Sequence, residues 1–361
     1  MININDIKRV YLIGIGGIGM SGLARYFNQR GCLVYGFDKT VTPLTKELVN
    51  EGIGISYVDD SDLIPISFQN NDSETLIVYT PAIPKDSNIL NFFKKENFEL
   101  YKRSQVLGII SNSMYCIAIA GTHGKTTTSS LVAHLLREGG IDCSAFLGGI
   151  ASNYASNLLI GKHDVVVVEA DEYDRSFLTL HPDIAVITSM DADHLDIYGE
   201  EEQLHQSFQL FANQLKSEGE LIVKEGLPIK NSMSYGLSKT AEAKGYNLNI
   251  KNGAFRFDFE NDNIKLTDLI LGLPGQHNIE NAVAAIQIAL TLNIKPELIR
   301  SGLASFKGVK RRFEYQVRTN KHIYIDDYAK ILGPDANLSP QSRQELAKIQ
   351  DIVAGVGVTD T

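Results

Sequence analysis

A chain of 361 residues is longer than the size at which a single hydrophobic core stops growing, so we expect more than one domain. Hydrophobic residues make up 43% of the chain and charged residues 21%, which excludes a largely disordered protein. The formal net charge of -9 argues against a nucleic-acid-binding surface, because such surfaces are basic.

The cysteines and the apolar runs indicate the compartment in which the chain works. Cys32, Cys116 and Cys143 are far apart and show no CxxC spacing, so they predict neither a disulfide framework nor a zinc site. No window approaches the roughly 20 apolar residues of a membrane span, and the first ten residues lack the pattern of a signal peptide. We therefore expect a cytoplasmic protein whose partners are neither nucleic acid nor membrane.

The first part of the chain alternates strand and helix patterns around a glycine-rich turn. RVYLIGIG predicts a strand, MSGLARYFNQRG a helix, LVYGFD a second strand, and TLIVYTPAI at residues 75–83 a further strand. In GIGGIG, Gly14, Gly16 and Gly19 follow the first strand and open the helix, and Asp38 ends the next strand. This is the dinucleotide fingerprint, so we assign residues 1–110 to a Rossmann-like parallel-sheet domain. The loop indicates a diphosphate more firmly than it indicates NAD, and a tight turn without a ligand is the alternative.

A second series of apolar runs begins near residue 111 with another glycine loop. CIAIAG, DVVVVEAD and IAVITSMDAD are typical of central parallel strands, each ending in polar residues. GTHGKTTT then supplies Gly121 and Gly124 to curl round phosphates, Lys125 to reach the terminal phosphates, and Thr126 to offer a hydroxyl to Mg²⁺. Ile119 stands where the usual GxxxxGK[ST] pattern begins with glycine, so the motif is a shortened P-loop. A glycine turn with a threonine cap is the alternative.

Acidic residues at the ends of two later strands are candidates for holding a cation. Glu169 ends a continuous apolar strand, where open α/β sheets place ligands, and is the first choice for Mg²⁺. The acidic residues after it follow too closely for all to point the same way, and some are expected to be caps or partners of Arg175: Asp171, Glu172 and Asp174. The next strand ends in Asp191, Asp193 and His194, and this histidine is either a second metal ligand or a structural residue.

The remaining segments predict an extension of the central domain and a short tail. In residues 219–267 the alternations of apolar and polar residues are shorter and more polar, which is consistent with an antiparallel excursion on the same domain. The segment GQHNIENAVAAIQIALTLNI then predicts a long helix. Fewer than about 50 residues follow the Arg311 and Arg312 pair, which is too few for an independent domain. We therefore expect a central P-loop ATPase-like α/β domain at 111–312 and a truncated further domain at 313–361.

Taken together, these segments resemble the Mur ligases of peptidoglycan synthesis. The resemblance rests on motifs that occur in the same order from Val10 to about Ala329: GIGGIGMSGLA, YTPAIP, KRSQVL, AGTHGKTTTSS, VVEADEYDRSFL, ITSMDADHLDIYG, GQHNIENA, GVKRRFE and YIDDY. It implies a ligase that binds ATP and Mg²⁺ and takes UDP-N-acetylmuramate and L-alanine as substrates. In the implied reaction ATP phosphorylates the lactyl carboxylate of the sugar, and the amine of L-alanine attacks the resulting acyl phosphate.

The resemblance also implies roles for particular residues. A UDP-sugar is implied at Gly16, Gly17, Ile18, Gly19, Asp38, Thr80, Ala82 and Arg103. ATP is implied at Gly121, Thr122, His123, Gly124, Lys125, Thr126, Thr127, His277, Asn278, Asn281 and Arg312, although which of Arg311 and Arg312 faces the nucleotide stays open. Thr126, Glu169 and His194 are the implied metal ligands, and Lys125, Glu169, His194 and Arg312 the implied catalytic residues.

The sequence departs from the family pattern in its last part and at Ser189, where many relatives have asparagine. Family members continue after DDY with a complete third domain that closes over ATP and brings the amino acid. Here we expect that domain to be absent or vestigial, both nucleotides to bind, and turnover to be very low. Three alternatives stay open: a UDP-sugar or ATP-binding module without catalysis, the related ligase that adds a recycled tripeptide to the same sugar, and a nicotinamide dehydrogenase, which would leave the P-loop and Glu169 unexplained.

Overall fold

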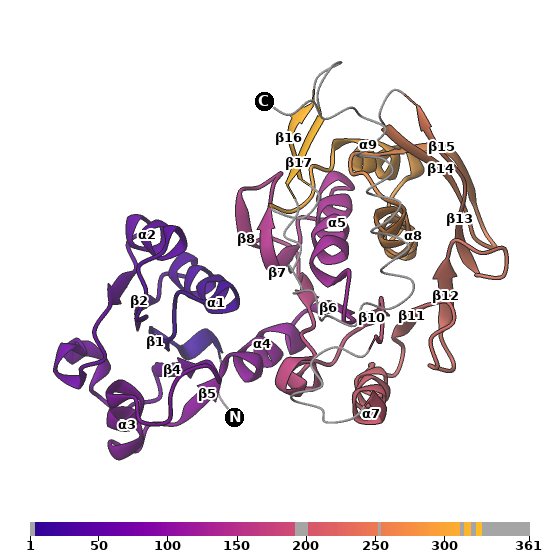
Figure 1. Ribbon diagram of the computed structural model, residues 1–361. Helices are drawn as coiled ribbons and strands as arrows, with labels where there is room; N and C mark the ends of the chain where they lie inside the picture. Colours follow the sequence, from indigo (N-terminus) through magenta and orange to yellow (C-terminus); the bar gives the residue numbers. More distant parts are fainter. Residues whose placement is uncertain (1–3, 192–200, 252–253, 311–313, 319–322, 327–361) are drawn as a thin grey trace, which may run out of the picture. The chain divides into compact units, whose positions relative to one another are not determined.

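The computed structural model describes residues 4–191, 201–251, 254–310, 314–318 and 323–326. The described residues belong to one compact unit, and residues 327–361 lie outside the described part of the chain. Within this unit, two large sheets follow one another along the chain, each with its own helices (Figure 1). The predicted α/β class is confirmed, whereas the predicted domain boundaries stay predictions.

The first sheet is parallel, with the strand order β3-β2-β1-β4-β5. Its strands are β1 (Arg9–Ile13), β2 (Leu33–Phe37), β3 (Gly54–Ser56), β4 (Thr75–Tyr79) and β5 (Leu100–Lys102). The helices of this part are α1 (Ile18–Gln29), α2 (Pro43–Asn50), α3 (Asn88–Lys95) and α4 (Arg103–Asn112), with short 3-10 turns η1 (Ile4–Asp6), η2 (Ser61–Leu63) and η3 (Ile66–Phe68). The strand predicted over 75–83 ends at Tyr79, because prolines at 81 and 84 lack the N–H that a sheet needs.

The second sheet has ten strands in the order β15-β14-β13-β12-β11-β10-β6-β9-β7-β8. They are β6 (Tyr115–Ala120), β7 (Ser144–Ala151), β8 (Ser156–Leu159), β9 (Val165–Glu169), β10 (Ile184–Ile187), β11 (Glu220–Lys224), β12 (Met233–Gly236), β13 (Ala243–Lys251), β14 (Ala254–Glu260) and β15 (Lys265–Leu271). Its helices are α5 (Lys125–Glu138), η4 (Tyr173–Thr179), α7 (Glu201–Ala212), α8 (Gln276–Thr291) and α9 (Pro296–Ser305). The antiparallel excursion predicted over residues 219–267 is confirmed only in its last part, where β13, β14 and β15 pair antiparallel. Its first part is wrong, because β11 and β12 pair parallel with their neighbours and continue the parallel sheet from β10 to β13. Further along, β16 (Glu314–Arg318) and β17 (Ile323–Asp326) form a separate antiparallel pair.

Strand β6 lies between β9 and β10 and has a hydrophobic cluster on each face. Its residues alternate between the clusters, as the two-residue period of a strand requires. Ala118 belongs to the cluster that includes Phe208 of α7, whereas Ile117 and Ile119 belong to the cluster that includes Leu131 of α5. This burial on both faces explains the continuous apolar run in the sequence.

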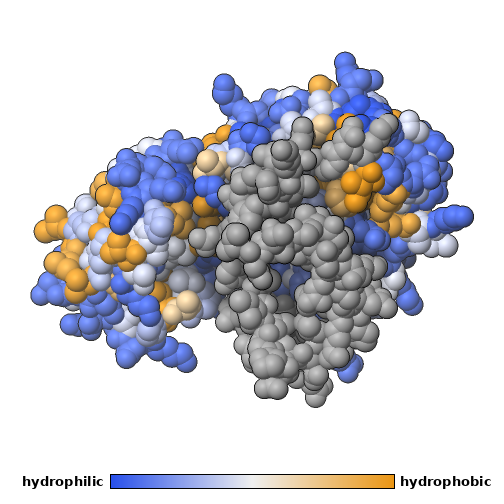
Figure 2. All heavy atoms as spheres, turned by 45° about the horizontal axis from the view of Figure 1, so that its top comes forward, coloured by the Kyte–Doolittle hydropathy of each residue, from blue (hydrophilic) through white to orange (hydrophobic). Residues whose placement is uncertain are grey.

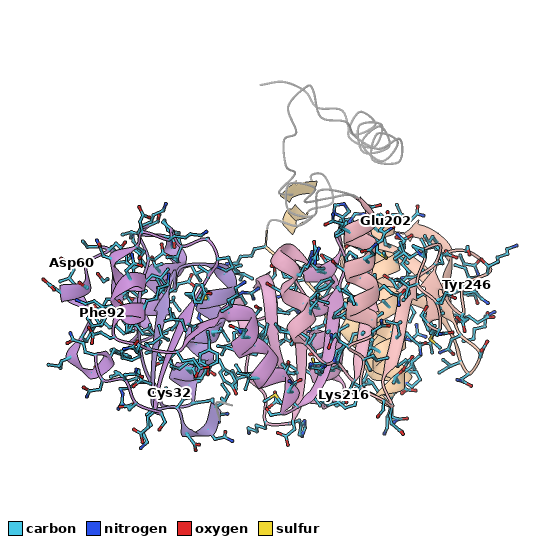
Figure 3. The ribbon with its side chains drawn as sticks, turned by 90° about the horizontal axis from the view of Figure 1, so that it is seen from below. Cys32, Asp60, Phe92, Glu202, Lys216 and Tyr246 are labelled. Atoms are coloured by element: carbon cyan, nitrogen blue, oxygen red, sulfur yellow. The ribbon has the colours of Figure 1, made fainter. Side chains whose placement is uncertain are left out.

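The amino ends of β6 and β10 are held by an ion pair. Lys216, labelled in Figure 3, lies with its Nζ 2.7 Å from Asp183 Oδ2. The Cys116 backbone N–H donates to the same carboxylate at 2.7 Å. The ion pair therefore lies at the amino ends of these strands, whereas the glycine loop follows the carboxyl end of β6.

Helix α5 packs beside α8 and α9, and a buried histidine joins it to α9. His134 Nδ1 lies 2.9 Å from Tyr154 Oη and its Nε2 lies 2.9 Å from Ser305 Oγ. A neutral imidazole satisfies both hydroxyls, since it donates from one nitrogen and accepts at the other. Burial lowers the pKa of His134 from its ordinary value of 6.5, and this effect exceeds the opposing effect of Glu138.

We expect this histidine to make the folded chain less stable in acid. Because its folded pKa is lowered, the unfolded chain binds the proton first as the pH falls through about 6.5, so the free energy of unfolding decreases from pH 7.5 to pH 5.5. Urea unfolding at both pH values should show a smaller decrease for His134→Gln than for the native chain. The matched control is the same substitution at the exposed His181, His181→Gln. An equal pH dependence in His134→Gln and in the native protein would show that His134 does not cause the loss of stability in acid.

The cysteines and the surface residues are distributed as in an ordinary globular protein. Cys32, Cys116 and Cys143 are free and buried, and burial raises the pKa of Cys116 to about 12 and that of Cys143 to about 11. On the face drawn in Figure 2, hydrophobic residues form separate patches among hydrophilic ones, which is usual for a protein surface. Among the described residues, no helix has the length and apolar character needed to cross a membrane.

Candidate active site

The loop between β6 and α5 has the backbone of a phosphate-binding turn. Gly121 and Gly124 have φ angles of +134° and +83°, which residues with a β-carbon rarely adopt. Gly124 precedes the first residue of α5, so the amino end of this helix opens at the loop. Free N–H groups and the partial positive charge at a helix start favour phosphate oxygens.

The Lys125 ammonium is held by two partners at the base of the loop. Its Nζ donates to the Gly121 carbonyl oxygen at 2.6 Å and lies 2.9 Å and 2.7 Å from Oε1 and Oε2 of Glu172. The Glu172 side chain is fully buried, and that of Lys125 is 14% exposed. The lysine therefore lies in the loop that the sequence predicts to hold terminal phosphates.

Strand β9 brings the Glu169 carboxylate to the Thr126 hydroxyl. Thr126 Oγ1 donates to Glu169 Oε1 at 2.9 Å, and the Gly148 backbone N–H of β7 donates to Oε2 at 2.8 Å. β9 pairs with β6 on one side and β7 on the other, which explains why these groups meet at one edge. A hydroxyl and a carboxylate in contact are the hard oxygen donors that Mg²⁺ prefers. Among the described residues, no three His, Cys, Asp or Glu side chains cluster as a metal cage, but Mg²⁺ in triphosphate sites takes its other ligands from phosphates and water.

The segment after β10 closes the other side of the loop. Ser189 Oγ accepts a hydrogen bond from the His123 backbone N–H at 2.7 Å and lies 2.9 Å from Thr122 Oγ1. The Asp191 backbone N–H donates to Thr122 Oγ1 at 3.1 Å, and the Asp191 Oδ2 atom lies 3.7 Å from His123 Nε2. Thr122 and His123 are therefore placed by side-chain contacts with the strand end beside β6. Thr127 is buried in the first turn of α5.

The start of α8 approaches the same loop. A β-carbon at Gly124 would lie 2.9 Å from Asn281 Oδ1, so this asparagine lies directly against the turn. Asn278 Nδ2 instead donates to the Pro274 carbonyl oxygen at 2.5 Å, which is a contact within its own helix start. The His277 ring lies beside Gly275. Of the three predicted ATP contacts on this helix, Asn281 is the one for which a contact with the glycine loop is described.

At the first glycine loop, the structure brings together several of the residues for which the sequence predicts a UDP-sugar contact. The Gly16 backbone N–H donates to Asp38 Oδ2 at 2.8 Å, and a β-carbon at Gly19 would lie 2.8 Å from Arg103 Nη1. The Thr80 methyl group lies against Gly14. Gly17 precedes the first residue of α1, Ile18 opens that helix with 37% of its surface exposed, and Ala82 is exposed in the turn after β4.

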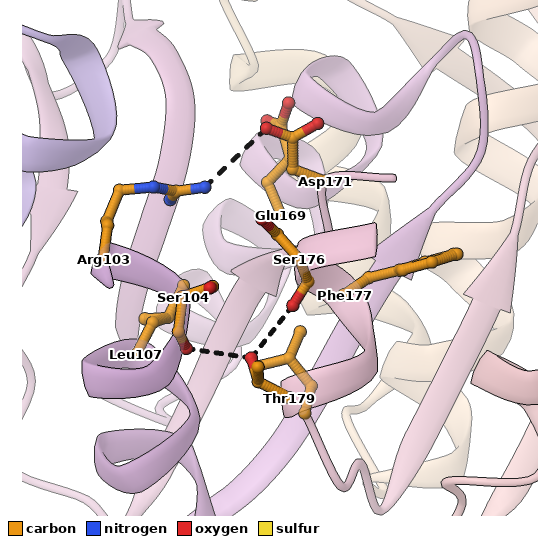
Figure 4. Close-up of a pocket in the computed structure, with 9 residues that line it drawn as sticks. Arg103, Ser104, Leu107, Glu169, Asp171, Ser176, Phe177 and Thr179 are labelled. Carbon is orange, nitrogen blue, oxygen red and sulfur yellow. Dashed lines mark hydrogen bonds and ion pairs between the residues drawn. The ribbon is translucent and has the colours of Figure 1, made fainter. Parts of the chain in front are cut away.

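Arg103 also extends toward the acidic segment after β9 (Figure 4). Its Nη2 lies 3.7 Å from Asp171 Oδ2. Nearby, Thr179 Oγ1 lies 2.8 Å from the Ser104 carbonyl oxygen and 2.9 Å from that of Ser176, which joins α4 to η4. The small pocket drawn there is lined by residues of both segments, Glu169 among them.

Comparison with known proteins identifies the family. The Mur ligase middle-domain model matches residues 119–289, and the model described as Mur ligase family, catalytic domain, matches residues 9–115. A UDP-N-acetylmuramate--L-alanine ligase of Christiangramia forsetii is 48% identical over 91% of this chain and 73% of its own length. The chain belongs to the Mur ligase family. A second Mur ligase of the same name, from Flavobacterium psychrophilum, is 49% identical over 91% of this chain and 72% of its own length.

A solved Mur ligase structure has the same fold. The UDP-N-acetylmuramate-alanine ligase of Thermotoga maritima matches with a TM-score of 0.80 and 25% identity, covering 95% of this chain and 77% of that one. The family resemblance inferred from the motifs is therefore confirmed. The roles of individual residues stay predictions, and His194 and Arg312, like Arg311, lie outside the described residues.

Three groups at this Mur ligase site were not singled out by the sequence. The spacing of the acidic residues does not distinguish Glu172 from its neighbours, Gly148 belongs to no motif, and Ser189 stands out only as a departure from the family pattern. Their contacts depend on strand order, because β7 and β10 reach the loop from opposite sides of β6 and β9. The only signal in the sequence was the position of Glu172 and Ser189 just after apolar strands, where open sheets collect functional groups.

Proposed function

We propose that this chain is an ATP-dependent ligase that joins L-alanine to the lactyl carboxylate of UDP-N-acetylmuramate in peptidoglycan biosynthesis. The observation that carries the proposal is the contact at 2.9 Å between the Glu169 carboxylate and the Thr126 hydroxyl, one residue after Lys125. The names of the relatives at 48% and 49% identity supply the substrates. The cytoplasmic location expected from the sequence stays a prediction.

The residues at the glycine loop between β6 and α5 would bind the triphosphate and its cation for phosphoryl transfer. The loop amides and the Lys125 ammonium bind the triphosphate and offset the repulsion between it and the sugar carboxylate. Thr126 and Glu169 would hold Mg²⁺, which supplies charge neutralisation on the phosphate oxygens. His194 and Arg312 are proposed as the ligand of a second cation and as a further phosphate contact.

The chemistry then needs no protein nucleophile. A carboxylate oxygen attacks the γ-phosphorus of ATP and ADP leaves, which converts an unreactive carboxylate into an acyl phosphate. The amine of L-alanine attacks the acyl carbon, and inorganic phosphate leaves as the amide forms. In this proposal residues 1–110 hold the UDP-sugar at the first loop and residues 111–312 hold ATP.

The test is release of inorganic phosphate by the purified chain with Mg-ATP. We expect release only when both UDP-N-acetylmuramate and L-alanine are present, with calorimetric binding of the UDP-sugar and of Mg-ATP separately. Binding of both without any release would favour a non-catalytic module. Binding of NADH in place of the UDP-sugar would contradict the proposal and favour a dehydrogenase.

A further inference from the structure

The buried carboxylate of Glu172 has no role in the reaction as described so far. It lies three residues beyond Glu169, immediately before η4, and its side chain is fully buried. Both of its carboxylate oxygens lie within 2.9 Å of Lys125 Nζ. The contact joins the first residue of α5 to the segment after β9. It therefore connects the chain segments that follow two neighbouring strands, β6 and β9.

The lysine has two kinds of partner, and they differ in how easily each is replaced. The Gly121 carbonyl is a neutral backbone group at 2.6 Å, whereas Glu172 is a carboxylate removed from water. An ammonium offers three donors, so it can keep one partner while it exchanges another. Drawing the lysine away from a fully buried carboxylate would separate a buried ion pair, which is far more costly than giving up one bond to a carbonyl.

A triphosphate that enters the loop should therefore displace the carbonyl and leave the carboxylate in place. On this basis we propose that Glu172 is a positioning residue, which holds the Lys125 side chain and directs its remaining donors to the terminal phosphate of the nucleotide. The inference rests on the proposed function, because it assumes that the loop binds a triphosphate. The contact with Glu172 persists in the bound state, and Gly121 gives up its bond to Nζ.

The experiment compares a triphosphate with a diphosphate, because only the former has the phosphate toward which Glu172 directs the lysine. Mg²⁺ with adenylyl imidodiphosphate and Mg²⁺ with ADP are titrated calorimetrically into the native chain, Glu172→Gln and Glu172→Asp. In Glu172→Gln we expect the preference for the triphosphate over ADP to fall about tenfold, the size of one charge-assisted contact, while ADP affinity changes less than threefold. Glu172→Asp, which keeps the charge, should restore part of the preference.

A matched control makes the same chemical change at another lysine–carboxylate contact of this domain, away from the glycine loop. Asp183→Asn removes the carboxylate opposite Lys216 at the amino ends of the strands, and it should leave the preference unchanged. Equal weakening of both nucleotides in Glu172→Gln, with a lowered melting temperature, would assign Glu172 to folding alone and overturn the proposal. An unchanged preference in Glu172→Gln would overturn it too. If the native chain binds neither nucleotide, the proposed function itself fails, and the inference with it.

Discussion

Replacing Glu169 with glutamine is expected to remove most of the magnesium dependence of ATP binding and to lower phosphate release about 10²–10³-fold, the usual effect of losing one electrostatic group at a transferring centre. Glutamine keeps the size of the side chain but loses the negative charge that a cation needs. Its amide nitrogen also cannot accept a hydrogen bond. It can therefore no longer accept from both the Thr126 hydroxyl and the Gly148 N–H, which bind opposite oxygens of the native carboxylate.

The measurement is ATP affinity with and without Mg²⁺, by calorimetry, in the native chain and in Glu169→Gln. We expect Mg²⁺ to strengthen binding at least tenfold in the native chain and by less than twofold in the variant, since one such contact corresponds to about a factor of ten. Glu138→Gln makes the same chemical change at the other end of α5, on an exposed side chain, and should behave as the native chain does. Equal magnesium dependence in Glu169→Gln and native protein would remove the basis for a cation at this position.

The central strands of the second sheet could be predicted from the sequence because they are buried on both faces. β6, β9 and β10 appear as continuous apolar runs that end in polar residues, and each run ends where the structure ends the strand to within a few positions. The carboxyl ends of parallel neighbours share one edge, so the meeting of Glu169 with the glycine loop followed from the pattern alone.

The contacts within the site could not be predicted to the same depth. Four acidic residues lie between positions 169 and 174, and their spacing does not say which side chain turns inward, because the chain leaves the strand there and begins η4. The structure turns Glu172 toward Lys125 and brings Asp171 near Arg103. Asn278 is a further case, since it is the third residue of α8 and its side-chain amide donates to the Pro274 carbonyl oxygen, a contact that the motif does not specify.

The largest loss of function is expected from Gly121→Ala, which should abolish measurable ATP binding and lower the free energy of unfolding by about 2–4 kcal/mol. A β-carbon there would overlap Thr188 Oγ1 and lie 2.8 Å from the Ser189 backbone nitrogen, at a φ angle of +134°. The loop must therefore move, and the carbonyl that accepts from Lys125 moves with it.

Gly140→Ala separates the steric overlap from backbone strain. Gly140 has a φ angle of +89°, but a β-carbon there would meet nothing within 4 Å. This control should cost only the strain of the left-handed backbone, about 1–2 kcal/mol, and should bind ATP as the native chain does. Urea unfolding and calorimetry on the two variants decide the matter: if Gly121→Ala retains ATP affinity within threefold of native while losing stability, the turn shapes the fold and does not enclose phosphates.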